Sequence, residues 1–419
     1  MEKLKIVGGN KLSGAISCSG AKNAALPMLA ATILSDKPIT FKNLPYLQDI
    51  TTMFEILGSM GADITLNENM DFIISTSKLH DFEARYELVK TMRASILVLG
   101  SLVARYGFAR IALPGGCAIG TRPVDFHLDA LEKLGAKIEL KNGYIEATSK
   151  KLIGCEINFQ GVSVTGTENI MMAAVLAKGQ TVLRNVAKEP EVQDLANFLN
   201  SMGAKINGAG SDEIIIDGVE DLDGTEFSIP ADRIEAGTYL IAAAITGGDV
   251  TISNVQAPRM NNILDKLKLS GASIAVGADN IQLIMENDAI LPVDISTAPF
   301  PGFPTDMQAQ FTVLNALSKG SSVVTENVFE NRFMHVQELN RMGCDITIKG
   351  SNAFIKGVDS LNGAPVMATD LRASASLILA GLCADGETIV DRIYHIDRGY
   401  ERIEEKLSYL GADITRLPN

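Results

Sequence analysis

One pattern of apolar and polar positions recurs along the chain about every 70 residues. Each copy begins with a nearly continuous run of small apolar residues, which predicts a buried helix, and continues through a short β-branched segment typical of a strand. A stretch with apolar residues three or four positions apart follows, as at Leu128, Leu131 and Leu134, and predicts an amphipathic helix. The buried helices are expected within residues 25–34, 94–104, 170–177, 236–244, 309–317 and 373–382.

Each amphipathic stretch ends on a glycine that we interpret as a left-handed helix cap. Successive glycines are 74, 68, 68, 72 and 68 residues apart, and they are Gly61, Gly135, Gly203, Gly271, Gly343 and Gly411. About 30 residues separate each of the first five from the next buried helix, which is enough for two strands. The chain therefore contains six repeated α-β-α-β-β units, and each unit can lay its helices against one small sheet.

The two ends of the chain complement each other. Only eight residues follow Gly411, so the sixth unit lacks its second strand. Residues 1–21 belong to no unit, and their apolar segments, from Leu4 to Val7 and from Gly14 to Cys18, are expected to replace that strand.

A division into three units per domain follows from this arrangement. It predicts a first domain over residues 22–229 and a second domain formed by residues 230–419 together with 1–21. The chain would then cross between domains near Ser19–Gly20 and again near Pro230–Ala231, and two crossings make a hinge. We expect the active site in the cleft between the two domains.

Composition narrows the classes of function. The net charge of −13 and the lack of a Lys/Arg run argue against nucleic acid as a partner. The five cysteines are scattered, without a CxxC or Cys/His cluster, which favours reduced thiols over disulfides or zinc. The four histidines do not pair at ligand spacing, so we expect no structural metal, and we also expect no cofactor. Because apolar runs stay shorter than about 18 residues, we expect a cytoplasmic protein that does not insert into membranes.

Polar residues stand at equivalent points of different units. Those that enter the buried helices include Lys22, Asn23, Arg93, Thr165, Asp232, Arg233, Asp306 and Arg372, and those before the amphipathic helices include Asp49, Arg122, Glu189, Arg259, Arg332 and Arg398. Equivalent positions point to the same end of a domain, where helix N-termini favour anions. Each cation alone could be a solvated surface charge, but the set predicts a shared site for phosphate and carboxylate groups.

Three further residues are candidates for chemistry. Cys117 lies in the glycine-rich loop from Leu113 to Arg122, where a thiol can be tuned for reaction or remain inert. Asp306 could assist a helix N-terminus or act as a general base. Asp370, which precedes Leu371 and Arg372, could be the ion-pair partner that orients an arginine.

Long strings of the sequence resemble the UDP-N-acetylglucosamine 1-carboxyvinyltransferase family, essentially from end to end. They are Ser19–Pro27, Lys90–Ser95, Leu113–His127, Phe303–Gln310, Phe329–His335, Met367–Ser376 and Asp391–Ile403. The resemblance implies the inside-out α/β barrel of enolpyruvyl transferases, with three repeated units in each of two domains. It also implies transfer of the enolpyruvyl group of phosphoenolpyruvate to the 3-hydroxyl of UDP-N-acetylglucosamine. Phosphate is released through a tetrahedral ketal, in the first committed step of peptidoglycan synthesis.

The resemblance also implies residue roles. Cys117 would be the general acid at C3 of phosphoenolpyruvate and the residue alkylated by fosfomycin, and Asp306 would be the base or the orienter of the sugar hydroxyl. Charge on phosphoenolpyruvate would be neutralised by Lys22, Arg93, Arg122 and Arg398. The sugar nucleotide would be contacted by Asn23, Arg122, Pro123, Val124, Asp125, Phe126, Gly161, Ser163, Val164, Val328 and Asp370, with Arg332 and Arg372 in support.

Alternatives remain within and outside this family. The sequence departs from some members at Gly161, Gln48 and Leu97, which we expect to change affinity and closure but not the type of reaction. One rival is 3-phosphoshikimate 1-carboxyvinyltransferase, which shares the architecture but does not use the loop cysteine. The other is a non-catalytic paralogue that binds sugar nucleotide and regulates wall synthesis.

Overall fold

The computed structural model describes residues 2–113, 124–286 and 289–418. These residues form two compact lobes, and the chain passes from one to the other after Ser19 and after Pro230. We call the described residues between 20 and 230 the first lobe. The second lobe consists of residues 2–19 and the described residues from 231 onward.

The first lobe contains three four-stranded sheets of one topology. In sheet order they are β14 (Glu226–Ser228), β3 (Ile39–Lys42), β5 (Phe72–Ser75) and β4 (Asp63–Leu66); β6 (Glu83–Ala84), β7 (Phe108–Ala112), β9 (Tyr144–Thr148) and β8 (Lys137–Lys141); and β10 (Glu156–Asn158), β11 (Gln180–Arg184), β13 (Glu213–Asp217) and β12 (Lys205–Asn207). In each sheet the first strand is parallel to the second, and the other pairs are antiparallel.

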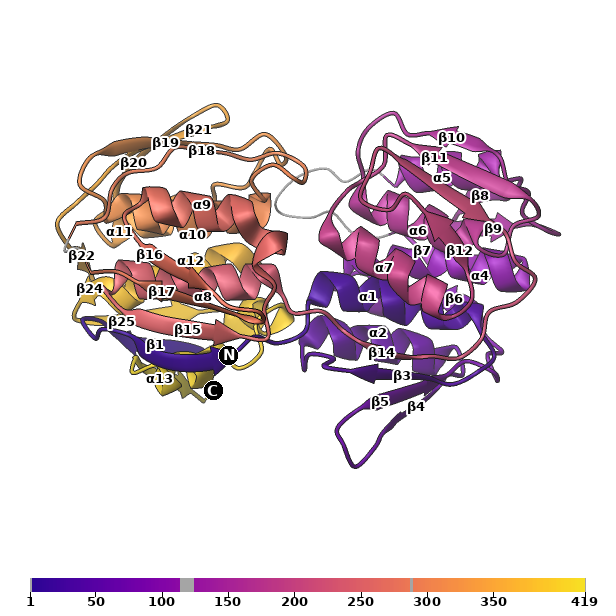
Figure 1. The fold of residues 1–419 in the computed structure, drawn as a ribbon, viewed down its shortest axis with the longest axis horizontal. Coiled ribbons are helices and arrows are strands. Elements are labelled where there is room, and N and C mark those ends of the chain that lie inside the picture. The colour runs from indigo at the N-terminus through magenta and orange to yellow at the C-terminus, as the bar shows by residue number, and fades with distance from the viewer. Residues whose placement is uncertain (1, 114–123, 287–288, 419) are drawn as a thin grey trace. The chain divides into compact units, whose positions relative to one another are not determined.

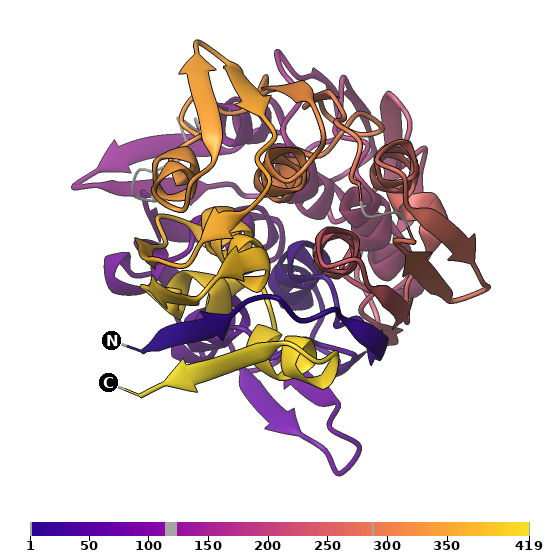
Figure 2. The same cartoon turned by 90° about the vertical axis from the view of Figure 1, so that its left-hand side faces the viewer.

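The second lobe repeats this topology. Its sheets are β2 (Ser13–Ser17), β15 (Asp249–Ser253), β17 (Asn280–Ile284) and β16 (Ser273–Val276); β18 (Ile295–Ser296), β19 (Ser321–Thr325), β21 (Asn352–Lys356) and β20 (Asp345–Lys349); and β23 (Pro365–Met367), β25 (Glu387–Asp391), β1 (Lys3–Val7) and β26 (Asp413–Leu417). A separate parallel pair joins β22 (Leu361–Asn362) to β24 (Ala384–Asp385). Figure 2 shows β1, in indigo, beside β26, in yellow.

The N-terminal segment takes part in two sheets rather than one. As expected, β1 is the missing strand of the sixth unit, and it pairs antiparallel with both β25 and β26. The expectation that the second apolar segment serves the same unit is wrong, because β2 pairs parallel with β15 of the fourth unit. Except for β2, the parallel edge strand of each sheet was missed, because these strands span only two or three residues and carry no clear alternation.

Six buried helices begin the six units, as the sequence predicts. They are α1 (Lys22–Ala31), α4 (Val98–Tyr106), α6 (Val164–Ala174), α8 (Arg233–Ile245), α10 (Gln308–Ala316) and α12 (Leu371–Cys383). The 3-10 turn η1 (Thr32–Leu34) extends α1, and η2 (Arg93–Leu97) precedes α4. Nearly every residue of α8, α10 and α12 is buried, so these helices have no polar face to turn outward.

These helices form the interior of each lobe. In the second lobe α8, α10 and α12 contact one another, and the sheets lie around them, with β15 and β1 on one side and β19 and β21 on another (Figure 1). The first lobe packs α1, α4 and α6 in the same way. Each lobe has its own hydrophobic core around these helices, in agreement with the inside-out arrangement that the resemblance implies.

Amphipathic helices pack against the buried helices in each lobe. The amphipathic helices are α2 (Gln48–Ser59), α5 (Asp125–Lys133), α7 (Pro190–Ser201), α9 (Asn261–Leu269), α11 (His335–Arg341) and α13 (Ile403–Tyr409), with the short α3 (Tyr86–Val89) before η2 and η3 (Ala257–Met260) before α9. All six capping glycines have φ between +95° and +105°, a region that favours glycine, so the predicted caps are confirmed. Across the described ranges, every helix is too short or too polar to cross a membrane.

Candidate functional site

Asp306 lies between two arginines in the second lobe. It belongs to the 3-10 turn η4 (Thr305–Met307) that leads into α10. Its Oδ1 is 2.6 Å from an Nη of Arg332, and its Oδ2 is 2.8 Å from an Nη of Arg372. Both arginines are 5% exposed, whereas the Asp306 side chain is 26% exposed, so the carboxylate is the part of this cluster that a ligand can reach.

The two arginines set the protonation state of Asp306. Burial by itself raises the pKa of this carboxyl, but the charges of Arg372 and Arg332 and their hydrogen bonds outweigh it and hold the pKa well below its usual range. Asp306 is therefore ionised at neutral pH. With each oxygen already paired to a guanidinium, it is better suited to orient a hydroxyl than to remove its proton in a first step.

A buried hydroxyl network supports Arg372 from behind. One Nη of Arg372 donates to the Tyr400 hydroxyl at 3.2 Å, and that hydroxyl lies 2.9 Å from Thr238 Oγ1. Gln310 Nε2 donates to Thr238 Oγ1 at 3.1 Å. The sequence analysis missed Tyr400, Thr238 and Gln310, although Gln310 and Thr238 are polar residues inside helices that the sequence predicts to be buried, which is the signal that could have found them.

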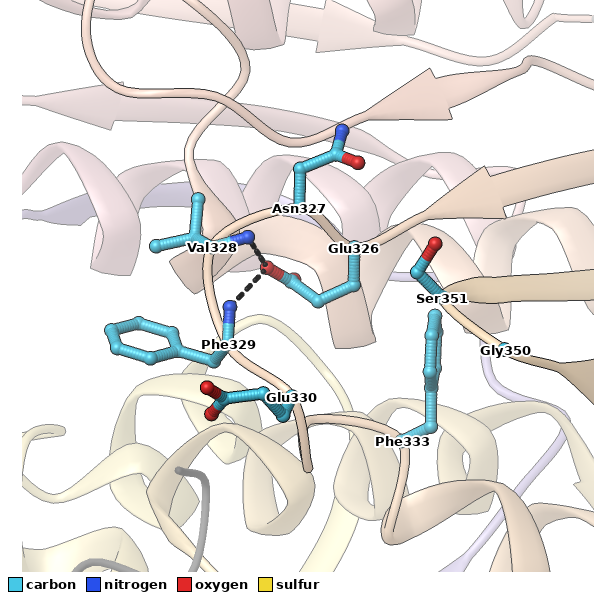
Figure 3. Close-up of a pocket in the computed structure, with 8 residues that line it drawn as sticks. All are labelled: Glu326, Asn327, Val328, Phe329, Glu330, Phe333, Gly350 and Ser351. Carbon is cyan, nitrogen blue, oxygen red and sulfur yellow. Dashed lines mark hydrogen bonds between the residues drawn. The ribbon is translucent and has the colours of Figure 1, made fainter. Parts of the chain in front are cut away.

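Glu326 supports Arg332 and the loop that contains Val328. It follows β19, is 4% exposed, and was also missed. Its Oε2 accepts from Thr305 Oγ1 at 2.8 Å, and Thr305 Oγ1 accepts from Arg332 at 2.9 Å. Its Oε1 accepts from the backbone nitrogens of Val328 and Phe329, at 2.8 and 3.1 Å (Figure 3).

A pocket borders this loop in the second lobe. It is lined by Glu326, Asn327, Val328, Phe329, Glu330, Phe333, Gly350 and Ser351, and Figure 3 shows the Glu326 carboxylate turned toward the backbone of the loop. Val328, expected to contact sugar nucleotide, is 37% exposed beside this pocket. The exposed apolar side chain of Val328, with the rings of Phe329 and Phe333 also lining the pocket, suits a ligand with an apolar part.

Asp370 has a different role from the one first considered. Its Oδ1 accepts from the backbone nitrogens of Arg372 and Ala373, at 2.9 and 3.1 Å, so it caps α12. The carboxylate that pairs with the guanidinium of Arg372 is Asp306. The idea that Asp370 orients an arginine by an ion pair is therefore wrong, and its effect on Arg372 comes through the helix N-terminus.

Lys22 and Asn23 begin α1 in the first lobe. The Lys22 ammonium is 3.0 Å from Asp49 Oδ2, and both residues are buried, at 9% and 4% exposed. Asn23, the next residue, is exposed. Asp49 thus holds the ammonium group at the N-terminus of α1, where a cation without a partner would be repelled by the helix dipole.

Some of the residues expected to bind the nucleotide lie close to one another. A Cβ built on Gly161 would lie 3.2 Å from the ring of Phe126, so the two residues are in close contact. Ser163 caps α6, its Oγ accepting from Gly166 N at 3.1 Å, and Val164 follows it. The glycine at 161 therefore has a local reason: a longer side chain would displace the Phe126 ring.

His127 is a buried histidine that links α5 to α6. Asn169 Nδ2 donates to its Nδ1 at 2.9 Å, and Thr165 Oγ1 lies 3.4 Å from its Nε2. Burial, with a smaller effect from the charge of Arg93, lowers the pKa of His127 to about 4. A neutral ring that accepts at Nδ1 carries its proton on Nε2, where it can donate to Thr165.

The remaining candidates lie at the ends of short helical segments or outside the described residues. Arg93 begins η2 in the first lobe, Arg398 ends the 3-10 turn η5 (Ile393–Arg398) in the second, and both are half-buried. Val124 and Asp125 lie at the start of α5. Cys117, Arg122 and Pro123 lie outside the described residues. Within the described ranges, no group of three or more His, Cys, Asp or Glu side chains could hold a metal ion.

Comparison with known proteins gives a consistent result. The model of the family described as EPSP synthase (3-phosphoshikimate 1-carboxyvinyltransferase) matches residues 6–407. UDP-N-acetylglucosamine 1-carboxyvinyltransferase of Coxiella burnetii (strain Dugway 5J108-111) is 59% identical, covering 100% of this chain and 96% of the relative. The protein of that name from Halorhodospira halophila is 57% identical, covering 100% of both chains.

Solved structures with the same fold are more distant in sequence. The enolpyruvyl transferase NikO from Streptomyces tendae superimposes with a TM-score of 0.90 at 27% identity, over 99% of both chains. An EPSP synthase from Acinetobacter baumannii superimposes with a TM-score of 0.79 at 20% identity, over 100% of both chains, and this likeness concerns the fold alone.

Proposed function

The chain belongs to the UDP-N-acetylglucosamine 1-carboxyvinyltransferases, within the wider family of the EPSP synthase model, and we propose that it transfers an enolpyruvyl group to UDP-N-acetylglucosamine. Phosphoenolpyruvate is the donor, the sugar 3-hydroxyl is the acceptor, and inorganic phosphate is released. The observation that carries this proposal is 59% identity over the full length of the chain to a relative with that name. The product would enter peptidoglycan synthesis, and so cell-wall biogenesis, cell shape and division.

The proposed reaction is an addition followed by an elimination. In the addition, the sugar 3-oxygen bonds to C2 of phosphoenolpyruvate, while C3 gains a proton and becomes a methyl group. The tetrahedral ketal then loses a proton from C3 and its phosphate from C2, which restores the double bond. The net change is one new C–O bond, one broken C–O bond to phosphate, and one proton passed from the hydroxyl to phosphate.

Four cations are assigned to neutralise the charge of the donor. We assign phosphate and carboxylate contacts to Lys22, Arg93, Arg122 and Arg398, because a preorganised positive charge stabilises the anion without reorganisation during the reaction. The proton at C3 is assigned to the thiol of Cys117. The sugar nucleotide is assigned to Asn23, Arg122, Pro123, Val124, Asp125, Phe126, Gly161, Ser163, Val164, Val328 and Asp370.

Asp306 is assigned to the sugar hydroxyl. Its ionised carboxylate can accept a hydrogen bond from the 3-hydroxyl and so direct the oxygen at C2. Because Arg332 and Arg372 keep its pKa low, the proton would move to Asp306 only as the new C–O bond forms and the hydroxyl becomes more acidic. A cytoplasmic location is also part of the proposal, since the described free cysteines suit a reducing compartment.

The test is phosphate release from phosphoenolpyruvate with two different acceptors. We expect turnover with UDP-N-acetylglucosamine and none with shikimate 3-phosphate. Turnover with shikimate 3-phosphate alone would identify the rival enzyme. Sugar-nucleotide binding without turnover on either acceptor would identify a regulatory paralogue.

A matched cysteine variant tests the role of the loop. Fosfomycin, an epoxide, is expected to alkylate Cys117, and intact mass would show one adduct on the wild-type protein. Cys117→Ser should lose the adduct and slow turnover severely, whereas Cys344→Ser, at a buried thiol of the second lobe, should keep both. Unchanged labelling and turnover in Cys117→Ser would remove that residue from the reaction.

A further inference from the structure

We propose that Glu326 is a positioning residue that holds the Asp306–Arg332 pair and the Val328 loop in one arrangement. This inference rests on the proposed function, because it concerns how the carboxylate assigned to the sugar hydroxyl is held. Glu326 itself is 4% exposed, so it acts through its neighbours and not by touching substrate.

The Glu326 carboxylate sits where three segments meet. It follows β19, and its neighbours come from the segment after β18, from η4 and from its own loop. Its Oε1 accepts from Thr297 Oγ1 at 2.9 Å and from the backbone nitrogens of Val328 and Phe329. Its Oε2 accepts from Thr305 Oγ1 at 2.8 Å. All four groups donate, so the site uses Glu326 only as an acceptor, as an ionised carboxylate requires.

The direction of each hydrogen bond on the Asp306 side follows from this. Thr305 has one hydroxyl hydrogen, and it is given to Glu326. The hydroxyl oxygen is then left to accept from Arg332, at 2.9 Å, and the other Nη of Arg332 pairs with Asp306 Oδ1. If Glu326 could not accept, the Thr305 hydroxyl would be free to turn, and Arg332 would lose one of its two fixed partners.

The other oxygen fixes the loop. Thr297 Oγ1 donates to Glu326 and also accepts from the backbone nitrogen of Asn327, at 2.8 Å. Three successive backbone nitrogens, at 327, 328 and 329, are thus tied directly or through one hydroxyl to the same carboxylate. Asp306 and Val328 are both assigned to the sugar nucleotide, and the hydrogen bonds of Glu326 fix the positions of both.

The test is a set of single-atom changes measured in the phosphate-release assay with UDP-N-acetylglucosamine. Glu326→Gln keeps an acceptor for the loop but presents an amide donor to Thr305. Thr305→Val removes the same link from the other side. Each should lower kcat by about tenfold or more, with a smaller change in the KM for sugar nucleotide. Thr305→Ser keeps the hydroxyl and should restore most of kcat.

The double variant decides whether the two residues act together. Glu326→Gln and Thr305→Val break one hydrogen bond from its two ends, so the double variant should be about as slow as either single variant. Thr297→Val, which disturbs the loop side only, should raise the KM for UDP-N-acetylglucosamine more than it lowers kcat. Thr312→Val is the matched control, because Thr312, like Thr297, is fully buried and its hydroxyl bonds only a helix carbonyl, and its kcat should match wild type.

Each outcome is decisive. A folded Glu326→Gln or Thr305→Val protein with wild-type kcat, or losses that multiply in the double variant, would overturn the inference. If Glu326→Gln fails to fold, the comparison of kcat between Thr305→Val and Thr305→Ser decides the question by itself. A wild-type protein without turnover overturns the proposed function and this inference with it, whereas an active wild type with active variants overturns only the inference.

Discussion

Single residues of this protein draw their chemistry from neighbours that are distant in sequence. Asp306 is an ordinary acid in a helix-entering turn until Arg332 and Arg372 pair with its two oxygens. Arg372 enters a buried helix and Arg332 precedes an amphipathic helix, the two points of the repeat from which a cation cluster was predicted. The sequence could not show that the cluster closes on Asp306 and not on Asp370, because that depends on differences of a few ångströms between side chains.

Replacement of Asp306 should therefore destabilise the second lobe in a pH-dependent way. Asp306→Asn leaves two buried guanidinium groups without a counter-charge and should lower the free energy of unfolding by about 3 kcal/mol at neutral pH. The pKa of Asp306 is lowered in the folded state. Its charge therefore stabilises the fold above the unfolded value, about 4, and this stabilisation is lost as the pH falls toward the folded value.

Urea unfolding between pH 3 and pH 7 measures this effect. The gap between wild type and Asp306→Asn should be constant above about pH 5 and should narrow below about pH 4. Asp359→Asn is the control, because Asp359 pairs with Lys319 at an exposed surface and should change stability little at any pH. A gap independent of pH would contradict an ionised, ion-paired Asp306.

At the scale of elements, local sequence signals were sufficient for most of the fold. The buried helices, the amphipathic helices and their glycine caps all follow from apolar spacing and from the position of glycine. The short parallel edge strands do not, because a strand of two or three residues has too few positions to show alternation, and its partner is chosen by the sheet beside it. β2 has five residues and its segment was expected to form a strand, but its partner was assigned wrongly because the sheet beside it decides which strand it joins.

Substitution by alanine should change the free energy of unfolding in opposite directions at two glycines with similar surroundings. Gly203 caps α7 at φ +101°, and Gly58 lies within α2; a Cβ on either would meet nothing within 4 Å. Gly203→Ala should therefore lower the free energy of unfolding by about 1 kcal/mol through backbone strain alone. Gly58→Ala should raise it by about 0.5 kcal/mol, because the unfolded chain loses freedom. Chemical denaturation of both variants checks this, and changes of the same sign would contradict it.

At the scale of the whole molecule, the order of residues along the chain does not decide which lobe they belong to. The second lobe takes its first residues from the N-terminus, and Leu4 and Ile6 are fully buried in its core. The first lobe has a core of its own, formed by residues between 21 and 229. The folding stability of each lobe should therefore not depend on damage to the other lobe.

Deletion of residues 1–9 tests this separation. The deletion removes β1 from between β25 and β26, leaving two open strand edges and a cavity where Leu4 and Ile6 were. Limited proteolysis with mass spectrometry should show digestion of residues beyond 231, while fragments within 20–230 stay protected. Lys5→Ala, which keeps the strand, should leave both lobes protected. Loss of both lobes together in the deletion variant would show that their stability is coupled.

The sequence by itself determined the six repeats, their buried helices and their caps, because these depend on spacing along one chain and on the hydrophobic effect. Only the tertiary structure decided which charges meet. It paired Asp306 with two arginines, Lys22 with Asp49, and Glu326 with both Thr305 and the Val328 loop. Hydrogen bonds and ion pairs act over about 3 Å, and distances of that size between remote segments are set by packing, not by spacing along the chain.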